Sequence, residues 1–120
     1  LLVEDNLELA NAISSRMVLD GHLVDHAAKI ADAVAFSRAG EYDLILLDIM
    51  MPGMDGIELS QKATEVAPEL KVMFITGFAA VTMKASREQP KAKVLSKPFH
   101  LNDLVLEVER IFSDEASVQL

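Results

Sequence analysis

Residues 44–56 read LILLDIMMPGMDG, and this stretch decides which fold the sequence is expected to adopt. Four aliphatic residues precede Asp48, so a short buried strand is expected to end on a carboxylate. Burying a carboxylate is costly unless a cation or a hydrogen-bond donor pairs with it. Pro52 and Gly53 mark a turn, and Gly56 permits a backbone conformation or a close approach that a side chain would hinder. Asp48 is therefore expected to meet a partner from elsewhere in the chain.

Short apolar runs alternate with longer amphipathic stretches along the whole chain, which predicts strands alternating with helices. The expected strands are residues 1–3, 23–27, 44–47, 72–75 and 92–95. Apolar stripes predict helices in residues 9–17 and 101–112, and weaker patterns predict helices in 30–38, 57–67 and 80–88. This alternation favours an α/β fold with a parallel sheet and helices on both faces, because crossover connections are right-handed.

The composition narrows the classes of function and the number of domains. A net charge of −8 at pH 7 opposes direct binding to nucleic acid. The absence of cysteine excludes disulfides, zinc–thiolate sites and thiol nucleophiles, and it permits the reducing cytoplasm expected here. No apolar run approaches the ~18 residues of a membrane span. At 120 residues we expect one domain over residues 1–112, followed by a tail or the start of a linker over 113–120.

Chemically active side chains follow four of the five expected strands. Glu4 and Asp5 follow the first strand, Asp48 the third, Thr76 the fourth and Lys97 the fifth. In an open parallel sheet, ligands bind beyond the carboxyl ends of the strands. The sequence therefore predicts that these residues form one site at one edge of the sheet.

Three of these residues are acidic, and a cluster of acids needs a cation. Carboxylates within ~5 Å of one another repel by roughly 3 kcal/mol per pair at an effective dielectric constant of 20. Carboxylate and carbonyl oxygens suit Mg²⁺, whereas the lack of thiolates and of clustered imidazoles argues against zinc. The predicted Mg²⁺ ligands are the side chains of Glu4, Asp5 and Asp48 and the main-chain carbonyl of Met50.

Asp48, Lys97 and Thr76 have separate expected roles. Asp48 stands alone on the central strand and is the expected nucleophile toward phosphorus, which would give an acyl phosphate. Lys97 is the expected countercharge for the phosphoryl oxygens. Thr76 offers a hydroxyl that is expected to donate to a phosphoryl oxygen and to move inward once the modification is present. That movement would be a switch.

Glu4-Asp5, Asp48 with MMPGMDG, Thr76 and Lys97-Pro98-Phe99 together resemble the receiver domain of two-component response regulators, over essentially the whole chain. The resemblance implies a flavodoxin-like (CheY-like), doubly wound, five-stranded sheet in the order 2-1-3-4-5 and a cis bond before Pro98. It also implies Mg²⁺-dependent transfer to Asp48 from the phosphohistidine of a histidine kinase or a histidine phosphotransfer protein. Such a domain is a signalling module rather than an enzyme, although it promotes its own phosphorylation and dephosphorylation. Its switch is read on the face formed by the fourth helix, the fifth strand and the fifth helix.

KVMFITGFAAV (residues 71–81) and AKVLSKPFHLNDLV (residues 92–105) look similar to CpdR-type single-domain regulators of alphaproteobacteria. That likeness implies action through protein partners, including the ClpX–ClpP protease, rather than through DNA. The sequence departs from many receivers at Val94, three positions before the lysine, where an aromatic residue is usual. The aromatic half of the usual coupling to the threonine is therefore in doubt, and a different output surface is expected.

Other functions on related folds remain open from the residues alone. A phosphorylation-independent interaction domain could share the same fold. A phosphatase of the haloacid-dehalogenase type uses an aspartyl nucleophile with a second acid two residues later, where this chain has Leu7 after Asp5. An FMN binder needs a hydroxyl- and glycine-rich loop after the first strand, and the acids at that position would repel phosphate.

Two further groups of residues carry weaker expectations. His22 and His26 straddle a strand start and lack partners for a metal, so a surface role is expected for both. An apolar docking rim for a phosphodonor and simple loop packing are equally good interpretations of a set of apolar residues around the predicted site: Leu7, Met50, Met51, Met54 and Phe78.

Overall fold

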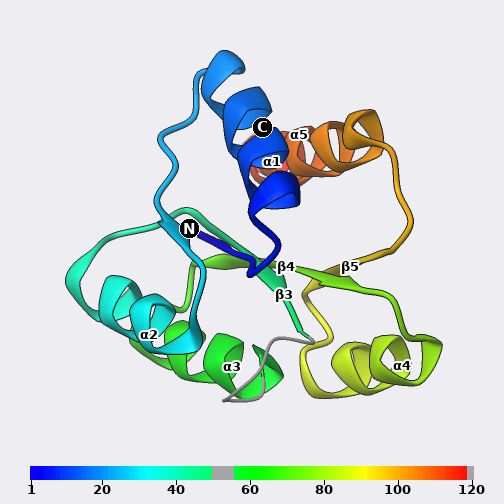
Figure 1. Ribbon diagram of the computed structural model, residues 1–120. Helices are drawn as coiled ribbons and strands as arrows, with labels where there is room; N and C mark the ends of the chain where they lie inside the picture. Colours follow the sequence, from blue (N-terminus) through cyan, green and yellow to red (C-terminus); the bar gives the residue numbers. More distant parts are fainter. Residues whose placement is uncertain (50–55, 119–120) are drawn as a thin grey trace.

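The computed structural model describes residues 1–49 and 56–118, and it contains a five-stranded parallel sheet between two layers of helices (Figure 1). The strands are β1 (Leu2–Val3), β2 (His26–Ala27), β3 (Leu44–Asp48), β4 (Lys71–Thr76) and β5 (Lys93–Ser96). The helices are α1 (Leu7–Leu19), α2 (Ile30–Ala39), α3 (Gly56–Val66), α4 (Ala79–Glu88) and α5 (Leu101–Val118). Helices α1 and α5 cover one face of the sheet, and α2, α3 and α4 cover the other.

The strand order is β2-β1-β3-β4-β5 and every pairing is parallel, which confirms the predicted fold. Asp48 at the end of β3 pairs with Ile75, the residue before Thr76, and Thr76 pairs with Ser96, the residue before Lys97. Because the strands are parallel and in this register, their carboxyl ends meet at one edge of the sheet.

The central strands are almost continuously apolar because both of their faces are covered. On β3, Ile45 and Leu47 enter the core beneath α2, α3 and α4, whereas Leu46 enters the core beneath α1 and α5. On β4, Phe74 enters the core beneath α2, α3 and α4, and Met73 enters the core beneath α1 and α5. This alternation fixes the direction of each side chain, so Asp48 is carried to the edge of the sheet by a strand that cannot slip without exposing its core residues.

Several details of the chain refine the expectations. Strand β2 begins at residue 26 rather than 23, since Leu23 is fully exposed and has no core to enter. The bond between Lys97 and Pro98 is cis, as expected. A Cβ at Gly56 would lie only 3.1 Å from the Cα of Ile49, which explains glycine at this close approach.

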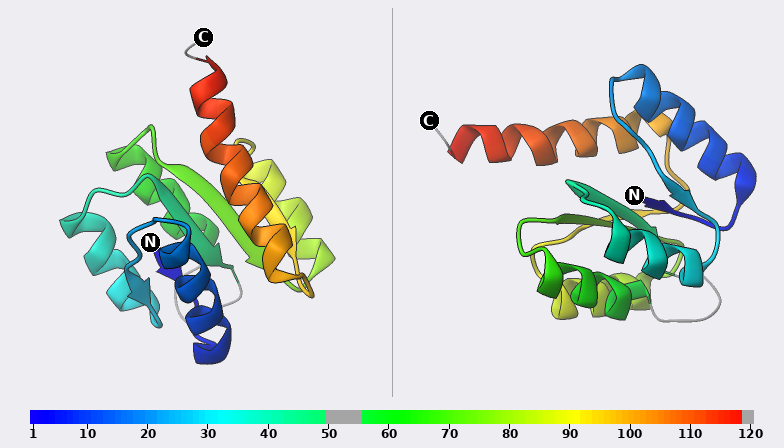
Figure 2. Two further views of the ribbon diagram at one scale, coloured as in Figure 1. Left: turned by 90° about the horizontal axis from the view of Figure 1, so that it is seen from above. Right: turned by 90° about the vertical axis from the view of Figure 1, so that its left-hand side faces the viewer.

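Helix α5 continues to Val118, and Figure 2 shows its end extending past the sheet. The predicted division between a domain over residues 1–112 and a tail over 113–120 therefore falls inside a helix, and the division itself stays a prediction. Within residues 1–49 and 56–118, no helix combines the length and the apolarity that crossing a membrane would require.

Candidate functional site

The three predicted acids meet at the edge of the sheet. Glu4 and Asp5 directly follow β1, and Asp48 is the last residue of β3. One carboxylate oxygen from each residue lies within 4.8 Å of the others. Glu4 is completely buried and Asp48 is 5% exposed, whereas Asp5 is exposed. Two of the acids thus form the floor of the cluster, and the third faces solvent.

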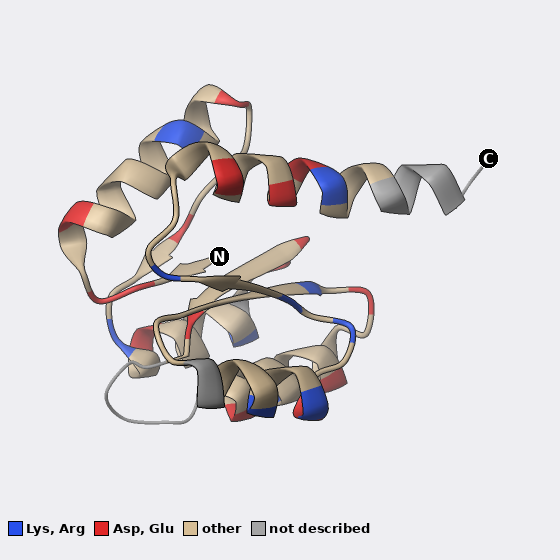
Figure 3. Cartoon of the chain, turned by 90° about the vertical axis from the view of Figure 1, so that its right-hand side faces the viewer, with Lys and Arg blue, Asp and Glu red and all other residues tan. Residues whose placement is uncertain are grey.

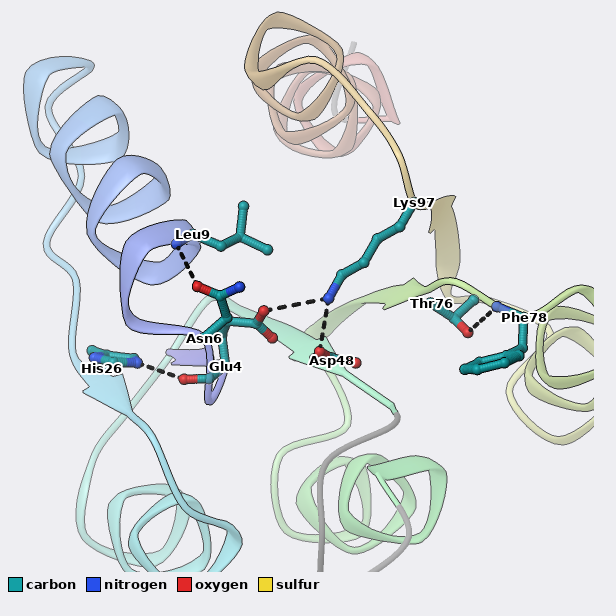
Figure 4. Close-up of polar contacts among 8 residues, drawn as sticks. All are labelled: Glu4, Asn6, Leu9, His26, Asp48, Thr76, Phe78 and Lys97. Carbon is teal, nitrogen blue, oxygen red and sulfur yellow. Dashed lines mark hydrogen bonds and ion pairs between the residues drawn. The ribbon is translucent and has the colours of Figure 1, made fainter.

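Lys97 reaches into the same cluster from the loop after β5 (Figure 4). Its Nζ lies 3.0 Å from Oδ2 of Asp48 and 3.4 Å from Oε1 of Glu4. The lysine side chain is one-third exposed, and its ammonium bridges the two buried acids. The loop after the fifth strand therefore supplies a cation to acids from the first and third strands.

Glu4 is a strongly perturbed acid of the cluster. Burial raises its pKa to about 8, and the neighbouring Asp48 adds to this rise while Lys97 opposes it. Asp48 and Glu4 raise the pKa of Lys97 against the opposing effect of burial. Among the described residues, Oε2 of Glu4 is a buried oxygen without a hydrogen-bond partner. The raised pKa and the unpaired oxygen indicate that Lys97 alone does not offset the cost of ionising Glu4.

The donor set fits Mg²⁺. If Glu4, Asp5 and Asp48 are all ionised, Lys97 neutralises one of three negative charges, and a divalent cation matches the two that remain. All three side chains offer the oxygen ligands that Mg²⁺ prefers. The predicted fourth ligand, the carbonyl of Met50, lies outside the described residues. The buried Oε2 of Glu4 adds an unsatisfied acceptor that a cation or its water could engage.

Replacing Glu4 by glutamine should change how stability depends on pH. Since the folded protein holds the Glu4 proton up to about pH 8 and the unfolded chain releases it near its ordinary pKa of 4.5, stability carried by this group is lost as pH rises between these values. Relative to the wild type, Glu4→Gln should therefore gain stability from pH 5 to pH 9, by at most about 1.4 kcal/mol per pH unit. Urea unfolding in EDTA measures this difference.

Glu8→Gln is the matched control for that experiment, because Glu8 is an exposed acid only four residues away on α1. Its stability relative to the wild type should stay nearly constant over the same pH range. Parallel pH profiles for the wild type and Glu4→Gln would show that Glu4 ionises normally in the folded protein.

Thr76 is buried at the end of β4 and is tied to both neighbouring loops. Its Oγ1 accepts a hydrogen bond of 3.2 Å from the amide of Phe78 (Figure 4). Its carbonyl accepts one of 2.7 Å from the amide of Lys97. Phe78 is the N-cap residue of α4, so the threonine hydroxyl is bonded directly to the start of that helix.

The other rim residues are placed only in part. Leu7 and Phe78 are 61% and 59% exposed, whereas Met50, Met51 and Met54 lie outside the described residues. The docking rim therefore stays a prediction. A cavity of about 670 Å³ lies elsewhere, since its lining includes Leu1 and Phe112 but no residue of the site: Glu4, Asp5, Asp48, Thr76 or Lys97.

His26 belongs to the site, although its sequence context indicated only a surface role. Its Nε2 lies 2.8 Å from the carbonyl oxygen of Glu4. The parallel pairing of β1 with β2 brings the two together, and that register is the signal from which the contact could have been expected. His22, by contrast, stacks on Phe112, with the ring centroids 5.7 Å apart.

Comparison with known proteins gives consistent matches. The family model described as the response regulator receiver domain matches residues 1–109. The response regulator receiver protein CpdR of Brucella abortus is 46% identical over 92% of this chain and 93% of its own length. The transcriptional regulatory protein TcrA of Mycobacterium tuberculosis is 33% identical, but the matched region spans only 42% of that protein.

The fold has close counterparts among solved structures. The crystal structure of a CheY-like response regulator receiver domain protein from Methanospirillum hungatei superimposes with a TM-score of 0.86. The alignment covers 97% of this chain and 94% of that one, at 24% sequence identity. At this identity, the likeness concerns the fold alone.

Proposed function

The chain belongs to the receiver domains of two-component response regulators, and from this premise we propose that it accepts a phosphoryl group on Asp48 and thereby controls a protein partner. The observation that carries the proposal is the position of Asp48, which lies at the end of the central strand within 4.8 Å of two other acids and 3.0 Å from the Lys97 ammonium. A carboxylate in this setting is a nucleophile whose reaction partner would arrive beside positive charge.

The chemistry requires one bond to form and one to break. An oxygen of Asp48 attacks phosphorus while the phosphorus–nitrogen bond of a phosphohistidine breaks, and the leaving imidazole nitrogen recovers a proton. Lys97 lies close enough to Asp48 for its ammonium to donate a hydrogen bond to an oxygen of the transferred phosphoryl group. Glu4, Asp5 and Asp48 would hold Mg²⁺, which supplies further positive charge for the phosphoryl oxygens when bound.

Thr76 would couple phosphorylation of Asp48 to a change at the start of α4. Its hydroxyl now accepts the Phe78 amide proton, and donating its own proton to a phosphoryl oxygen would turn it toward Asp48. That rotation strains or breaks the bond to the start of α4. Val94 is partly buried against the core beneath α2, α3 and α4, and it pairs with Phe74 on β4. We therefore assign the coupling in this chain to the Thr76–Phe78 bond rather than to an aromatic residue at position 94.

The partners follow from the family and from charge. A histidine kinase or a histidine phosphotransfer protein is the proposed donor. The downstream partner is a protein, for which the resemblance to CpdR makes a ClpX–ClpP protease system the candidate to test. Basic positions in Figure 3 occur in both helical layers with acidic positions among them, and the net charge is −8, so direct nucleic-acid binding is not proposed. A cytoplasmic setting suits all these partners.

Phosphoryl uptake in the presence of Mg²⁺ tests the function directly. We expect incubation with acetyl phosphate and Mg²⁺ to add one phosphoryl group to the intact mass, and EDTA to prevent the addition. A mass that stays unchanged both with acetyl phosphate and with a phosphorylated histidine kinase would refute the proposal and favour a phosphorylation-independent interaction domain.

Removing the threonine hydroxyl should separate phosphorylation from switching. Thr76→Ala is expected to accept a phosphoryl group on Asp48 but to lose the response of α4. The variant has no hydroxyl that could exchange its bond with the Phe78 amide for a bond with the phosphoryl group. Amide chemical shifts of residues 78–88, followed by NMR as beryllofluoride is added, report this response. Thr76→Ser keeps the hydroxyl and should respond as the wild type does. An equal response in Thr76→Ala would place the switch elsewhere.

A further inference from the structure

The backbone of Glu4 is held at both of its polar groups by the two residues of β2. Its amide donates to the carbonyl of Ala27 at 3.1 Å. Its carbonyl accepts from the ring of His26 at 2.8 Å, as Figure 4 shows. A carbonyl oxygen can only accept, so Nε2 of His26 carries the proton of this bond. The bond thus links the side chain of an edge strand to the acid pair of the site.

The carbonyl of Glu4 belongs to the peptide group that joins Glu4 to Asp5. On the other side of Asp5, Asn6 caps α1, since its Oδ1 accepts from the amide of Leu9 at 3.1 Å. Asp5 therefore stands between two fixed points, one provided by His26 and the other by the helix cap. Its own side chain is exposed, so little packing directs its carboxylate and the backbone must do so.

We propose that His26 is a positioning residue for Mg²⁺ binding, because it fixes the Glu4–Asp5 peptide and thereby aims the Asp5 carboxylate at the acidic cluster. The inference rests on the proposed function, since it assigns His26 a role in the same metal site. His26 acts through the backbone and does not itself bind the metal. Strand β2 has only two residues and pairs with β1 over two positions, so the imidazole bond adds to a short main-chain ladder.

Three variants separate positioning from general stability. His26→Leu removes the donor, whereas His26→Gln keeps an N–H at a similar distance from the backbone. His22→Leu is the matched control, because His22 lies four residues earlier and stacks on Phe112 instead. Isothermal titration should show that the dissociation constant for Mg²⁺ rises about tenfold in His26→Leu, because losing a group that orients a metal ligand typically weakens binding by at least this factor. The constant should be nearly unchanged in His26→Gln and His22→Leu.

Two further measurements keep the inference distinct from the proposed function. Without metal, the NMR amide signals of Asp5 and Asn6 should shift or broaden in His26→Leu and be restored in His26→Gln. The rate at which His26→Leu takes up a phosphoryl group from acetyl phosphate should be low at low Mg²⁺. It should reach the wild-type rate at saturating Mg²⁺, because only the affinity for the metal is impaired. His26→Asn, whose shorter amide does not reach the carbonyl, should behave like His26→Leu and replaces it if that variant does not fold.

Some outcomes would overturn the role of His26. These are wild-type Mg²⁺ affinity in both His26→Leu and His26→Asn, or equal losses in His26→Leu and His26→Gln that saturating Mg²⁺ does not repair. Failure of the wild type itself to bind Mg²⁺ or accept a phosphoryl group would instead refute the proposed function, and the metal-free NMR comparison would still test whether His26 fixes the Asp5 backbone.

Discussion

Replacing Asp48 by asparagine is expected to abolish phosphoryl uptake, with a fall in rate of at least about a thousandfold. The amide is nearly the same size as the carboxylate, but its oxygen is a poor nucleophile. Glu4 is not expected to take over the reaction, because it is completely buried. Intact mass after incubation with acetyl phosphate and Mg²⁺ measures the loss.

The control for this variant lies just before the same strand. Asp43→Asn changes an exposed acid immediately before β3, at the opposite end from Asp48, and should leave uptake unchanged. Phosphoryl uptake by Asp48→Asn at the wild-type rate would mean that another residue is the acceptor. Asp5 would then be the first alternative to test, because it is the exposed acid of the cluster.

The fold was predictable because the central strands are short, apolar and buried on both faces. Strands β3 and β4 both begin and end within one residue of the expected positions, since polar residues directly flank their apolar runs. Strand β2 was less predictable, because Leu23 and Val24 continue the apolar pattern although Leu23 is fully exposed. Apolar character alone does not say whether a residue has a sheet to join.

The gathering of the site residues was predictable for a topological reason, whereas their environments were not. A parallel sheet brings the carboxyl ends of its strands to one edge, so Glu4, Asp48 and Lys97 were expected to be neighbours. The sequence does not reveal that Glu4 is buried while the adjacent Asp5 is exposed. Alternation along a strand indicates that consecutive side chains point to opposite sides, but not which side is buried at the strand end. The contact of His26 depends on pairing between residues more than twenty positions apart in sequence, which no local pattern encodes.

Replacing Lys97 by methionine should slow phosphoryl uptake by about a hundredfold without weakening Mg²⁺ binding. The methionine side chain keeps an unbranched apolar stem but lacks the ammonium that lies 3.0 Å from Asp48, so one source of charge stabilisation for the phosphoryl oxygens is lost. Removing a positive charge from beside the acids makes the cluster more attractive to a divalent cation. Isothermal titration should therefore give a dissociation constant for Mg²⁺ that is equal to or lower than that of the wild type.

This opposite response of two measurements distinguishes charge stabilisation from damage to the pocket. Lys93→Met is the matched control, because Lys93 is an exposed lysine at the start of the same strand, and both its uptake rate and its Mg²⁺ affinity should match the wild type. Slow uptake together with weaker Mg²⁺ binding in Lys97→Met would mean that the lysine holds the acids in place rather than acting on the phosphoryl group. Uptake at the wild-type rate would remove Lys97 from the chemistry and leave the cation as the main source of positive charge at Asp48.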